Sequence, residues 1–382
     1  MPYTYYEFFA GGGMARIGLG ENWQCLLAND ICNKKAACYH GYFGSDHLLV
    51  EDVAKIETAQ LPGVAQFAWA SFPCQDLSLA GNYTGLSGER SGLFWPFWHL
   101  MQSLQQEGRA PGMIVLENVR GAITSHGGRD LVGIAETLIK SGYRFAPLLI
   151  DAVHFVPQSR PRLFIVAVSD DWTVPEVLTT GAPMAEWHPD ALGVVYDLLS
   201  PDFREKWIWL RLPMPELDRR SFDDLIDDEP EGVNWHTQLE TKRLISMMSP
   251  VNRAKVKEAQ KSGRRCVGTL YRRTRIQDGV KQQRAEVRFD VAGCLRTPVG
   301  GSSRQTIILV NGNKVRSRLL APREAARLMG LPEDYPLPVN YNNAYHLAGD
   351  GVVVPVVRHL AEHILLPIMH ANEMSGVLSL CR

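Results

Sequence analysis

One cysteine stands where a reactive thiol could act. Cys74 follows Pro73 at the end of the apolar segment 66–72 and precedes a stretch rich in glycine and serine. A free thiol is only slightly ionised near neutral pH, so a nucleophilic cysteine needs a positive charge or a helix N-terminus nearby. Arg160 and Arg162 could supply that charge. The ordinary alternative is a buried cysteine that acts as a small hydrophobic residue.

A carboxylate and two amides could complete a site around this thiol. Glu117 and Asn118 end the apolar segment 112–119, and Gln158 precedes the two arginines in QSRPR. In one crevice, desolvation would raise the pKa of Glu117 and the arginines would lower it, and the sequence leaves open which effect dominates. For each of these residues a buried ion pair or a structural cap is the alternative.

A glycine-rich segment near the N-terminus could bind a cofactor. EFFAGGGMARIGLG, residues 7–20, follows a predicted strand and opens a predicted helix. Glycines allow a ligand to approach the backbone closely, and a helix N-terminus favours negative charge. Asp30 ends the next apolar segment, where a carboxylate can accept hydrogen bonds from ribose hydroxyls. The pair predicts an adenosine-type cofactor. A nicotinamide cofactor fits less well, because Arg16 stands at the third glycine position of GxGxxG.

The elements that must position these residues alternate between short apolar runs and helical spacing through the first 170 residues. The runs predict strands at 3–10, 23–30, 66–72, 112–119 and 162–168, each followed by polar residues. This alternation is typical of an α/β fold in which helices cover a parallel sheet. Open sheets of this kind bind ligands at the carboxyl ends of their strands. Asp30, Cys74 and Glu117 would all lie there.

From about residue 172 the sequence changes to segments rich in tryptophan and proline. Residues 253–288 hold twelve Lys or Arg against three acids, and the dipeptides Asp278-Gly279 and Asn311-Gly312 favour tight hairpins. These features predict a small β-rich unit with a basic face. A helix is expected to begin at Pro322 and to end before Gly330. We predict one domain at residues 1–171, completed by 340–382, and a second domain at 172–339.

Composition argues against several classes of protein. The 40 Lys and Arg nearly balance the 41 Asp and Glu, so the overall charge does not by itself indicate a nucleic-acid partner. No signal sequence is evident, and no run approaches the roughly 18 apolar residues of a membrane span, so a cytoplasmic protein without a membrane partner is expected. Seven cysteines without a CxxC pair argue against a disulfide framework and a cysteine-rich zinc site. No metal site is expected.

Six motifs occur in an order that resembles the DNA cytosine-5 methyltransferases of the bacterial or phage restriction-modification type. They are FFAGGG, Pro73-Cys74-Gln75, Glu117-Asn118-Val119, Gln158-x-Arg160-x-Arg162, PREAARLMGLPEDY and GDGVVVPVV. The likeness covers nearly the whole chain except about residues 172 to 290. It implies a Rossmann-like sheet of the S-adenosylmethionine-dependent methyltransferases together with a smaller β-rich target-recognition domain.

The resemblance implies a chemistry for the residues around Cys74. Cytosine C5 is a poor nucleophile, and the thiolate of Cys74 would activate the ring by adding to C6. Glu117 would bind N3 and the exocyclic amine, Arg162 would hold O2, and Arg160 would lie near a phosphate or near Glu117. Asn118 would position the turn at the thiol. C5 would then take the methyl group of S-adenosylmethionine, and the target cytosine would have to be flipped out of the duplex.

The resemblance also implies the contacts to cofactor and DNA. Asp30 would bind the ribose and Asp52 the adenine amine, and further cofactor contacts are expected at Phe9, Gly11, Gly13, Pro73 and Asp350. DNA contacts are expected at Ser78, Ser87 and Arg90 in a mobile loop from Asp76 to Phe94, and at Gln158, Arg272, Arg273, Arg275 and Arg304. A solvated basic face is the alternative for each arginine of the second domain. The target sequence is unreadable, because this region carries no transferable code.

A few positions depart from the family pattern. Glu7 and Met14 stand where the family usually has Asp and Gly, and Asp350-Gly351 replaces Asn-Ser in the closing motif. Ala321 replaces the usual Thr before PRE, which removes a helix N-cap worth about 1 kcal/mol. The departures at Glu7 and Met14 leave the geometry of the glycine-rich loop open. Asp350 would place an anion near the expected cofactor carboxylate unless its side chain turns toward the ammonium group of the cofactor.

Two other readings of the sequence stay open. One is a tRNA cytosine-5 methyltransferase built on the same motifs, and the other is a catalytically silent DNA-binding regulator of the same fold. The expected partners are double-stranded DNA and a cognate restriction endonuclease or other defence-system proteins. The expected state is a monomer, associated with the bacterial nucleoid through DNA.

Overall fold

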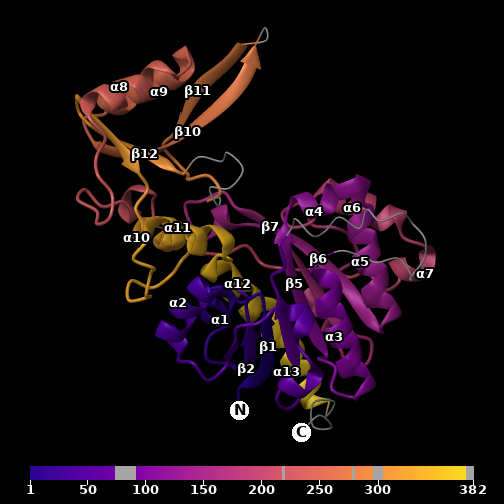
Figure 1. Ribbon diagram of the computed structural model, residues 1–382. Coiled ribbons are helices and arrows are strands. Elements are labelled where there is room, and N and C mark those ends of the chain that lie inside the picture. The colour runs from indigo at the N-terminus through magenta and orange to yellow at the C-terminus, as the bar shows by residue number, and fades with distance from the viewer. Residues whose placement is uncertain (74–91, 217–219, 278–279, 296–303, 376–382) are drawn as a thin grey trace. The chain divides into compact units, whose positions relative to one another are not determined.

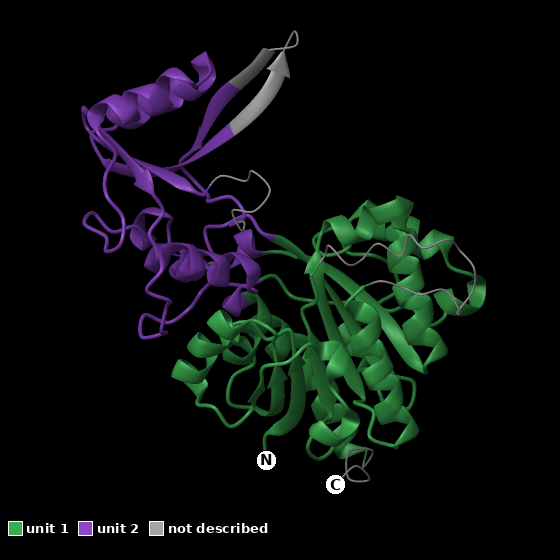
Figure 2. Ribbon diagram, viewed as in Figure 1, with its two compact units in different colours: residues 1–151, 161–214, 356–382 green, residues 152–160, 215–355 purple. Residues whose placement is uncertain are grey.

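The structure, a computed structural model, describes residues 1–73, 92–216, 220–277, 280–295 and 304–375, with only the backbone of 273–277 and 280–282. It divides into two compact units (Figure 2). The first holds residues 1–151, 161–214 and 356–382, and the second holds residues 152–160 and 215–355.

The borders of these units differ from the predicted domain borders at 171/172 and 339/340. Residues 172–214 belong to the first unit, where the ring of Trp172 fills the space beside Gly112 and α6 (Asp190–Leu198) packs on α5 (Arg129–Lys140). At the other border, the backbone N–H of Val354 donates to the carbonyl of Met329 at 2.9 Å. The segment 340–355 therefore belongs to the second unit. The change in composition at 172 marks new covering elements of the first unit.

Seven strands form the sheet of the first unit (Figure 1). Their order is β3 (Leu48–Leu49), β2 (Trp23–Asn29), β1 (Tyr3–Phe8), β4 (Phe67–Ala70), β5 (Met113–Val119), β7 (Pro161–Ser169) and β6 (Tyr143–Asp151). All five predicted strands are present. The prediction of a parallel sheet is wrong at one edge, because β7 runs antiparallel to both β5 and β6. The beginning of β7 therefore lies at the end of the sheet where β1, β4 and β5 have their carboxyl ends.

The central strands are buried on both faces, which explains their continuous apolar runs. Phe67, Trp69, Val115 and Val166 are fully buried. Apolar side chains of α3 (Phe94–Gln106), α5 and α6 complete the core on one face of the sheet. The other elements of this unit are α1 (Met14–Leu19), α2 (Asn33–Phe43), α4 (Gly121–Thr124), α7 (Pro201–Arg204), α13 (Leu366–Met374) and the pair β8 (Thr179–Thr180) and β9 (Trp209–Leu210), with α12 (Val354–Leu360) beginning at the unit border.

The second unit contains the predicted β-rich region. Its antiparallel sheet has the order β11 (Val280–Arg288), β10 (Arg265–Gln277), β12 (Thr306–Asn311) and β13 (Lys314–Leu319). Apolar residues of α8 (Gln238–Ser246) and α9 (Pro250–Lys261) pack on this sheet. The pairing of Gln277 with Val280 agrees with the hairpin predicted at Asp278-Gly279, although these two residues lie outside the described ranges. Gly312 forms the second hairpin turn with φ of 53°.

The helix predicted at Pro322 is confirmed as α10 (Pro322–Leu328), and α11 (Tyr341–Asp350) follows it. Ala321 supplies no side-chain cap. Instead the carboxylate of Glu324 accepts the backbone N–H of Ala321 at 2.7 Å and forms a fully buried ion pair with Arg318 at 2.6 Å. Glu324 thus supplies its own half of a capping box, while the half that a threonine at position 321 would supply is missing.

One stretch of the described residues has the length and composition of a membrane span. It is Tyr341–Met374, with a mean hydropathy of 1.5 over its most apolar window. This window is 67% buried inside the protein. Its apolar composition therefore follows from packing in the core and is only weak evidence of a membrane segment.

Candidate active site

The glycine-rich loop leaves β1 through a backbone in the left-handed region. Phe9 has φ of 58°, which residues other than glycine rarely adopt, and Gly11 has φ of 57°. The loop is held to the next strand, because the backbone N–H of Ala10 donates to the carbonyl of Asn29 at 2.8 Å. Asp30 holds it further: one carboxylate oxygen accepts the N–H of Gly11 at 2.8 Å and the other accepts the N–H of Cys32 at 2.7 Å.

Gly13 is fixed by close packing as well as by its φ of 78°. A Cβ atom at this position would lie 2.4 Å from the ring of Phe43 and 2.9 Å from that of Tyr39. Arg16 holds both rings, since its guanidinium lies 4.3 Å from the Phe43 centroid and donates to the hydroxyl of Tyr39 at 2.7 Å. In the sequence alone, Arg16 stands out only as a mismatch to the dinucleotide motif GxGxxG. Its contacts stabilise the glycine-rich loop.

Glu7 lies beneath this loop and is 1% exposed. Burial raises its pKa to about 8, although the charge of Arg16 and the backbone N–H of that residue oppose the shift. One of its carboxylate oxygens, Oε2, has no hydrogen-bond partner within the described part of the chain. A neutral, protonated carboxyl group fits this surrounding better than an anion does. Glu7, which stands where the family usually has Asp, therefore carries a buried proton near the loop.

Asp52 caps a short helical turn at the same end of the sheet. Its Oδ1 accepts the N–H of Ala54 at 3.0 Å, and the residue is half-buried. The other carboxylate oxygen of Asp52, Oδ2, makes no hydrogen bond to the described residues. Asn29 anchors the backbone just before Asp52, because its side-chain amide donates to the carbonyl of Glu51 at 2.8 Å.

The segment that leads to Cys74 is anchored from two sides. Asn118 donates from Nδ2 to the carbonyl of Phe72 at 2.9 Å, two residues before the thiol. The rings of Phe72 and Phe9 meet edge to face at 6.5 Å, which joins this segment to the glycine-rich loop. Pro73 is exposed. Cys74, Ser78, Ser87 and Arg90 lie outside the described residues.

Glu117 and Arg162 meet across β5 and β7. Arg162 pairs in register with Val119, so its side chain stands diagonally opposite Glu117 on the same face of the sheet. Nε of Arg162 lies 3.2 Å from Oε1 of Glu117. The side chains are 16% and 9% exposed. An ion pair that is so little exposed to water places a fixed donor and a fixed acceptor side by side at the end of the sheet where β4 stops, two residues before Phe72.

Gln158 and Arg160 are placed differently from their predicted roles. Gln158 is fully buried in the second unit, where its amide donates to the carbonyl of Leu328 at 2.9 Å and accepts the N–H of Leu295 at 3.1 Å. The DNA contact predicted for Gln158 does not agree with this position. Arg160 is 1% exposed. Its guanidinium donates to the carbonyls of Leu295, Gly349 and Gly351 at 2.7 to 2.9 Å.

Arg160 is therefore a structural link rather than the phosphate or Glu117 contact that the motif predicts. A guanidinium has five N–H donors, and a buried one must satisfy them within the protein. Here they hold the segment at 294–295 to the closing motif at 349–351, all within the second unit. Asp350, which stands between the two carbonyls, is exposed at the end of α11.

The remaining predicted DNA contacts lie in the second unit. Arg272 is exposed on β10, and Arg273 and Arg275 occupy the same strand, where their side chains are not described. The guanidinium of Arg304 lies 5.3 Å from the ring centroid of Tyr341. Within the described residues no group of three His, Cys, Asp or Glu side chains could hold a metal ion.

The chain is similar to known proteins over nearly its whole length. The family model for C-5 cytosine-specific DNA methylase matches residues 3–366. The type II methyltransferase M.DsaV of Dactylococcopsis salina is 26% identical over 94% of this chain and 85% of its own length. The type II methyltransferase M.MspI of a Moraxella species is 23% identical over 98% of this chain and 73% of its own. The fold resembles that of DNMT2 from Spodoptera frugiperda, with a TM-score of 0.57, 16% identity and coverage of 96% and 99% of the two chains.

Proposed function

The chain belongs to the C-5 cytosine-specific DNA methylase family, and from this premise we propose that it methylates C5 of a cytosine flipped out of duplex DNA, through a transient bond between Sγ of Cys74 and C6. The enzyme class is a DNA cytosine-5 methyltransferase, and its curated relatives are type II methyltransferases. The observation that carries the covalent mechanism is the convergence of the Glu117–Arg162 pair and of Phe72, held by Asn118, at one edge of the sheet.

The proposed steps assign a task to each residue. The thiolate of Cys74 forms a bond to C6, and the electrons of the C5–C6 double bond move toward C5 and the ring. Glu117 accepts from the exocyclic amine and supports N3, and Arg162 donates to O2, so charge that develops on the ring meets groups already in place. After C5 has bonded to the methyl group that the donor would supply, a water molecule accepts the C5 proton, the electrons of the C5–H bond restore the C5–C6 double bond, and the S–C6 bond breaks with return of the thiolate.

The residues at the carboxyl ends of β1 and β2 fit the methyl donor. S-adenosylmethionine, when bound, supplies an electrophilic methyl group on a sulfonium. Asp30 keeps lone pairs for ribose hydroxyls even while its two oxygens accept backbone N–H groups, and Asp52 presents a half-buried carboxylate for an adenine amine. Ile31, next to Asp30, is 66% exposed and offers an apolar surface for the adenine ring. Phe9, Gly11, Gly13, Pro73 and Asp350 are the further contacts that we propose.

DNA binding is assigned to the basic second unit and to the segment after Cys74. Arg272, Arg273, Arg275 and Arg304 are the proposed contacts of the second unit, with Ser78, Ser87 and Arg90 on the segment after the thiol. Because the target is DNA, we place the protein inside the cell, where it acts as a monomer. A restriction endonuclease with the same target is the proposed partner, by analogy with the type II relatives.

Expression in cells, followed by bisulfite sequencing of their DNA, tests the proposal directly. The wild-type chain should leave methylated cytosines within one sequence context, and Cys74→Ala should leave none while it still binds S-adenosylmethionine in vitro. Purified enzyme should transfer label to duplex DNA and not to tRNA. Transfer of the labelled methyl group to tRNA alone would favour the RNA alternative. If Cys74→Ala still methylated its substrate, the thiol would be excluded from the mechanism.

A further inference from the structure

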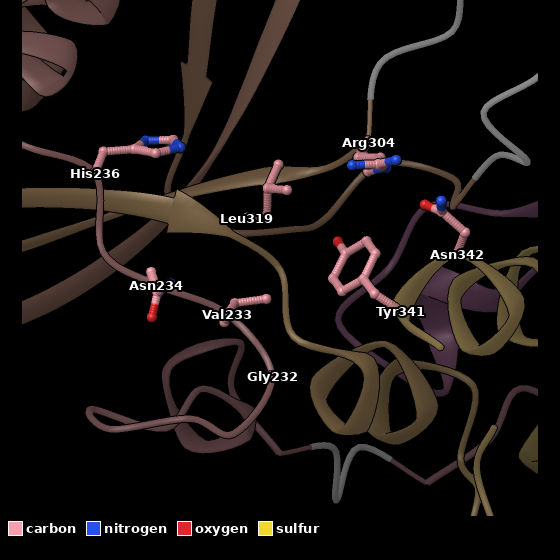
Figure 3. Close-up of a pocket in the computed structure, with 8 residues that line it drawn as sticks. All are labelled: Gly232, Val233, Asn234, His236, Arg304, Leu319, Tyr341 and Asn342. Carbon is pink, nitrogen blue, oxygen red and sulfur yellow. The ribbon is translucent and has the colours of Figure 1, made fainter. Parts of the chain in front are cut away.

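A pocket in the second unit has no role in the chemistry described so far (Figure 3). Its volume is about 350 Å³, and it lies between the segment 232–236, the end of β13 and the start of α11. Polar side chains gather in it from separate parts of the chain, and they include His236, Arg304 and Asn342. None of the lining residues is acidic.

Arg304 is held in place at this pocket by an aromatic platform. Figure 3 shows its guanidinium beside the ring of Tyr341, and the distance from the guanidinium carbon to the ring centroid is 5.3 Å. Tyr341 is itself fixed, because its hydroxyl donates to the carbonyl of Leu320 at 2.8 Å and its ring stacks on Tyr345 at 5.9 Å. An arginine ordered in this way loses less conformational freedom when it binds a ligand.

The charge of Arg304 is not neutralised by an acid in the described ranges. Arg316, Arg318 and Arg327 of the same unit all form ion pairs with Asp or Glu. Arg304 makes only its contact to the tyrosine ring among the described residues. A guanidinium that is pre-positioned, partly buried and without a counter-ion is suited to bind an anion.

Charged groups of both signs lie near His236, and the carboxylate of Glu240 acts on it more strongly than the guanidinium of Arg272 does. Burial lowers the pKa of His236, Glu240 opposes this shift, and the charge of Arg272 lowers it as well. Arg272 therefore acts on the pocket from β10. The carboxylate of Glu240 is engaged by the N–H and hydroxyl of Thr237. A neutral imidazole, with Nδ1 at 3.0 Å from the hydroxyl of Ser317, can offer its other nitrogen as a donor.

We propose that this pocket binds a phosphodiester group of the DNA duplex, with Arg304 as its charged contact and Asn342 and His236 as hydrogen-bond donors. The inference rests on the proposed function, since it takes DNA as the substrate. A phosphate fits because its oxygens accept hydrogen bonds from several directions, whereas a base edge requires donors and acceptors in a fixed order. The contact would position the second unit on the duplex and would not select a sequence.

Salt dependence of DNA binding distinguishes a phosphate contact from the other possibilities. In the full chain, Arg304→Gln should make the slope of log K against log salt less negative by about 0.9 between roughly 50 and 200 mM. The change should be equal for a duplex that contains the sequence context found by bisulfite sequencing (the methylated-context duplex) and for an unrelated duplex. Arg304→Lys should keep the slope because it keeps the charge. Arg220→Gln is the matched control: Arg220 is exposed in the same unit beside Asp224 and Glu333, and its loss should leave the slope unchanged.

A second variant separates binding from folding. Asn342 is exposed in the first turn of α11, where an aspartate favours the helix, so Asn342→Asp should melt no earlier than wild type. Its added anion should nevertheless weaken DNA binding by on the order of tenfold at low salt. Inorganic phosphate is the control ligand. If phosphate raises the melting temperature of wild type but not of Arg304→Gln, while DNA binding is unchanged, the pocket binds a free anion and the DNA assignment is wrong.

The outcomes also separate this inference from the proposed function. If wild type binds and methylates DNA but Arg304→Gln and Asn342→Asp bind it with unchanged affinity and slope, the pocket inference alone fails. If Arg304→Gln weakens binding only to the methylated-context duplex, the pocket reads a base and the phosphate assignment is overturned. If wild type neither binds nor methylates DNA, the proposed function itself fails.

Discussion

Arg162 reaches across two antiparallel strands to place its Nε 3.2 Å from Oε1 of Glu117. Because β7 is antiparallel to β5, the arginine at the beginning of one strand meets the glutamate near the end of the other. The pair is therefore built into the sheet and does not depend on a loop. In the proposed mechanism, this pair is the position at which the cytosine ring is held.

Glu117→Gln tests the role of this carboxylate. The amide keeps the size of the side chain but loses the charge that stabilises the developing ring, so the rate of methyl transfer should fall by roughly 10²- to 10³-fold. Binding of S-adenosylmethionine, measured by calorimetry, should stay within about twofold of wild type. The matched control is Glu136→Gln, whose carboxylate pairs with Lys140 on the surface of α5. Unchanged turnover in Glu117→Gln would exclude the residue from catalysis.

Gly13→Ala tests the packing of the glycine-rich loop. The added Cβ meets both the left-handed φ of 78° and the rings of Phe43 and Tyr39. Gly127→Ala is the control, because Gly127 has φ of 70° and ψ of 27°, close to the 78° and 27° of Gly13, but nothing within 4 Å of the added atom. The control should lose only the backbone term, about 1–2 kcal/mol of stability. Gly13→Ala should lose more and should bind S-adenosylmethionine more weakly; equal effects of the two variants on unfolding and on ligand binding would contradict this account.

Glu7→Gln tests the buried proton near the loop. The pKa of Glu7 is about 8 in the folded protein against an ordinary value of 4.5, so between these values the folded state binds the extra proton. Its contribution to stability is fully present below pH 4.5 and is lost as the pH rises through 8, at up to about 1.4 kcal/mol per pH unit.

Urea unfolding at pH 6 and pH 8.5 measures this effect. Relative to wild type, Glu7→Gln should be more stable at pH 8.5 than at pH 6, because the glutamine has no proton to lose. The exposed Glu21→Gln should follow wild type at both values. Parallel pH dependence of wild type and Glu7→Gln would mean that Glu7 is not protonated in the folded state in this range.

The sequence predicted those features that depend on local pattern. Apolar runs located five strands, the Pro322 and Gly330 signals bounded α10, and residues at strand ends indicated where Glu117, Asp30 and the glycine-rich loop would gather. These predictions succeed because buried strands and helix ends have short-range signatures. The direction of β7 could not be predicted in this way, because the pairing of strands depends on contacts between residues far apart in the chain.

Side-chain roles within one motif were harder to predict than the motif itself. Gln158, Arg160 and Arg162 alternate along one segment, yet the first two are buried links of the second unit and only Arg162 reaches the carboxylate. A motif records which residues are present, whereas their task depends on the carbonyls and carboxylates that the fold brings to them. Arg16 shows the same limit, because its contacts to Tyr39 and Phe43 come from a later helix.

Covalent trapping tests the central claim most directly. A duplex with 5-fluorocytosine at the position identified by bisulfite sequencing should be incubated with the enzyme and S-adenosylmethionine, because fluorine at C5 replaces the proton whose loss would release the thiol. The account predicts a denaturation-resistant protein–DNA complex whose only crosslinked peptide contains Cys74, and none with Cys74→Ala. A duplex that is bound and presented with the methyl donor but yields no covalent complex, or one crosslinked elsewhere, would contradict it.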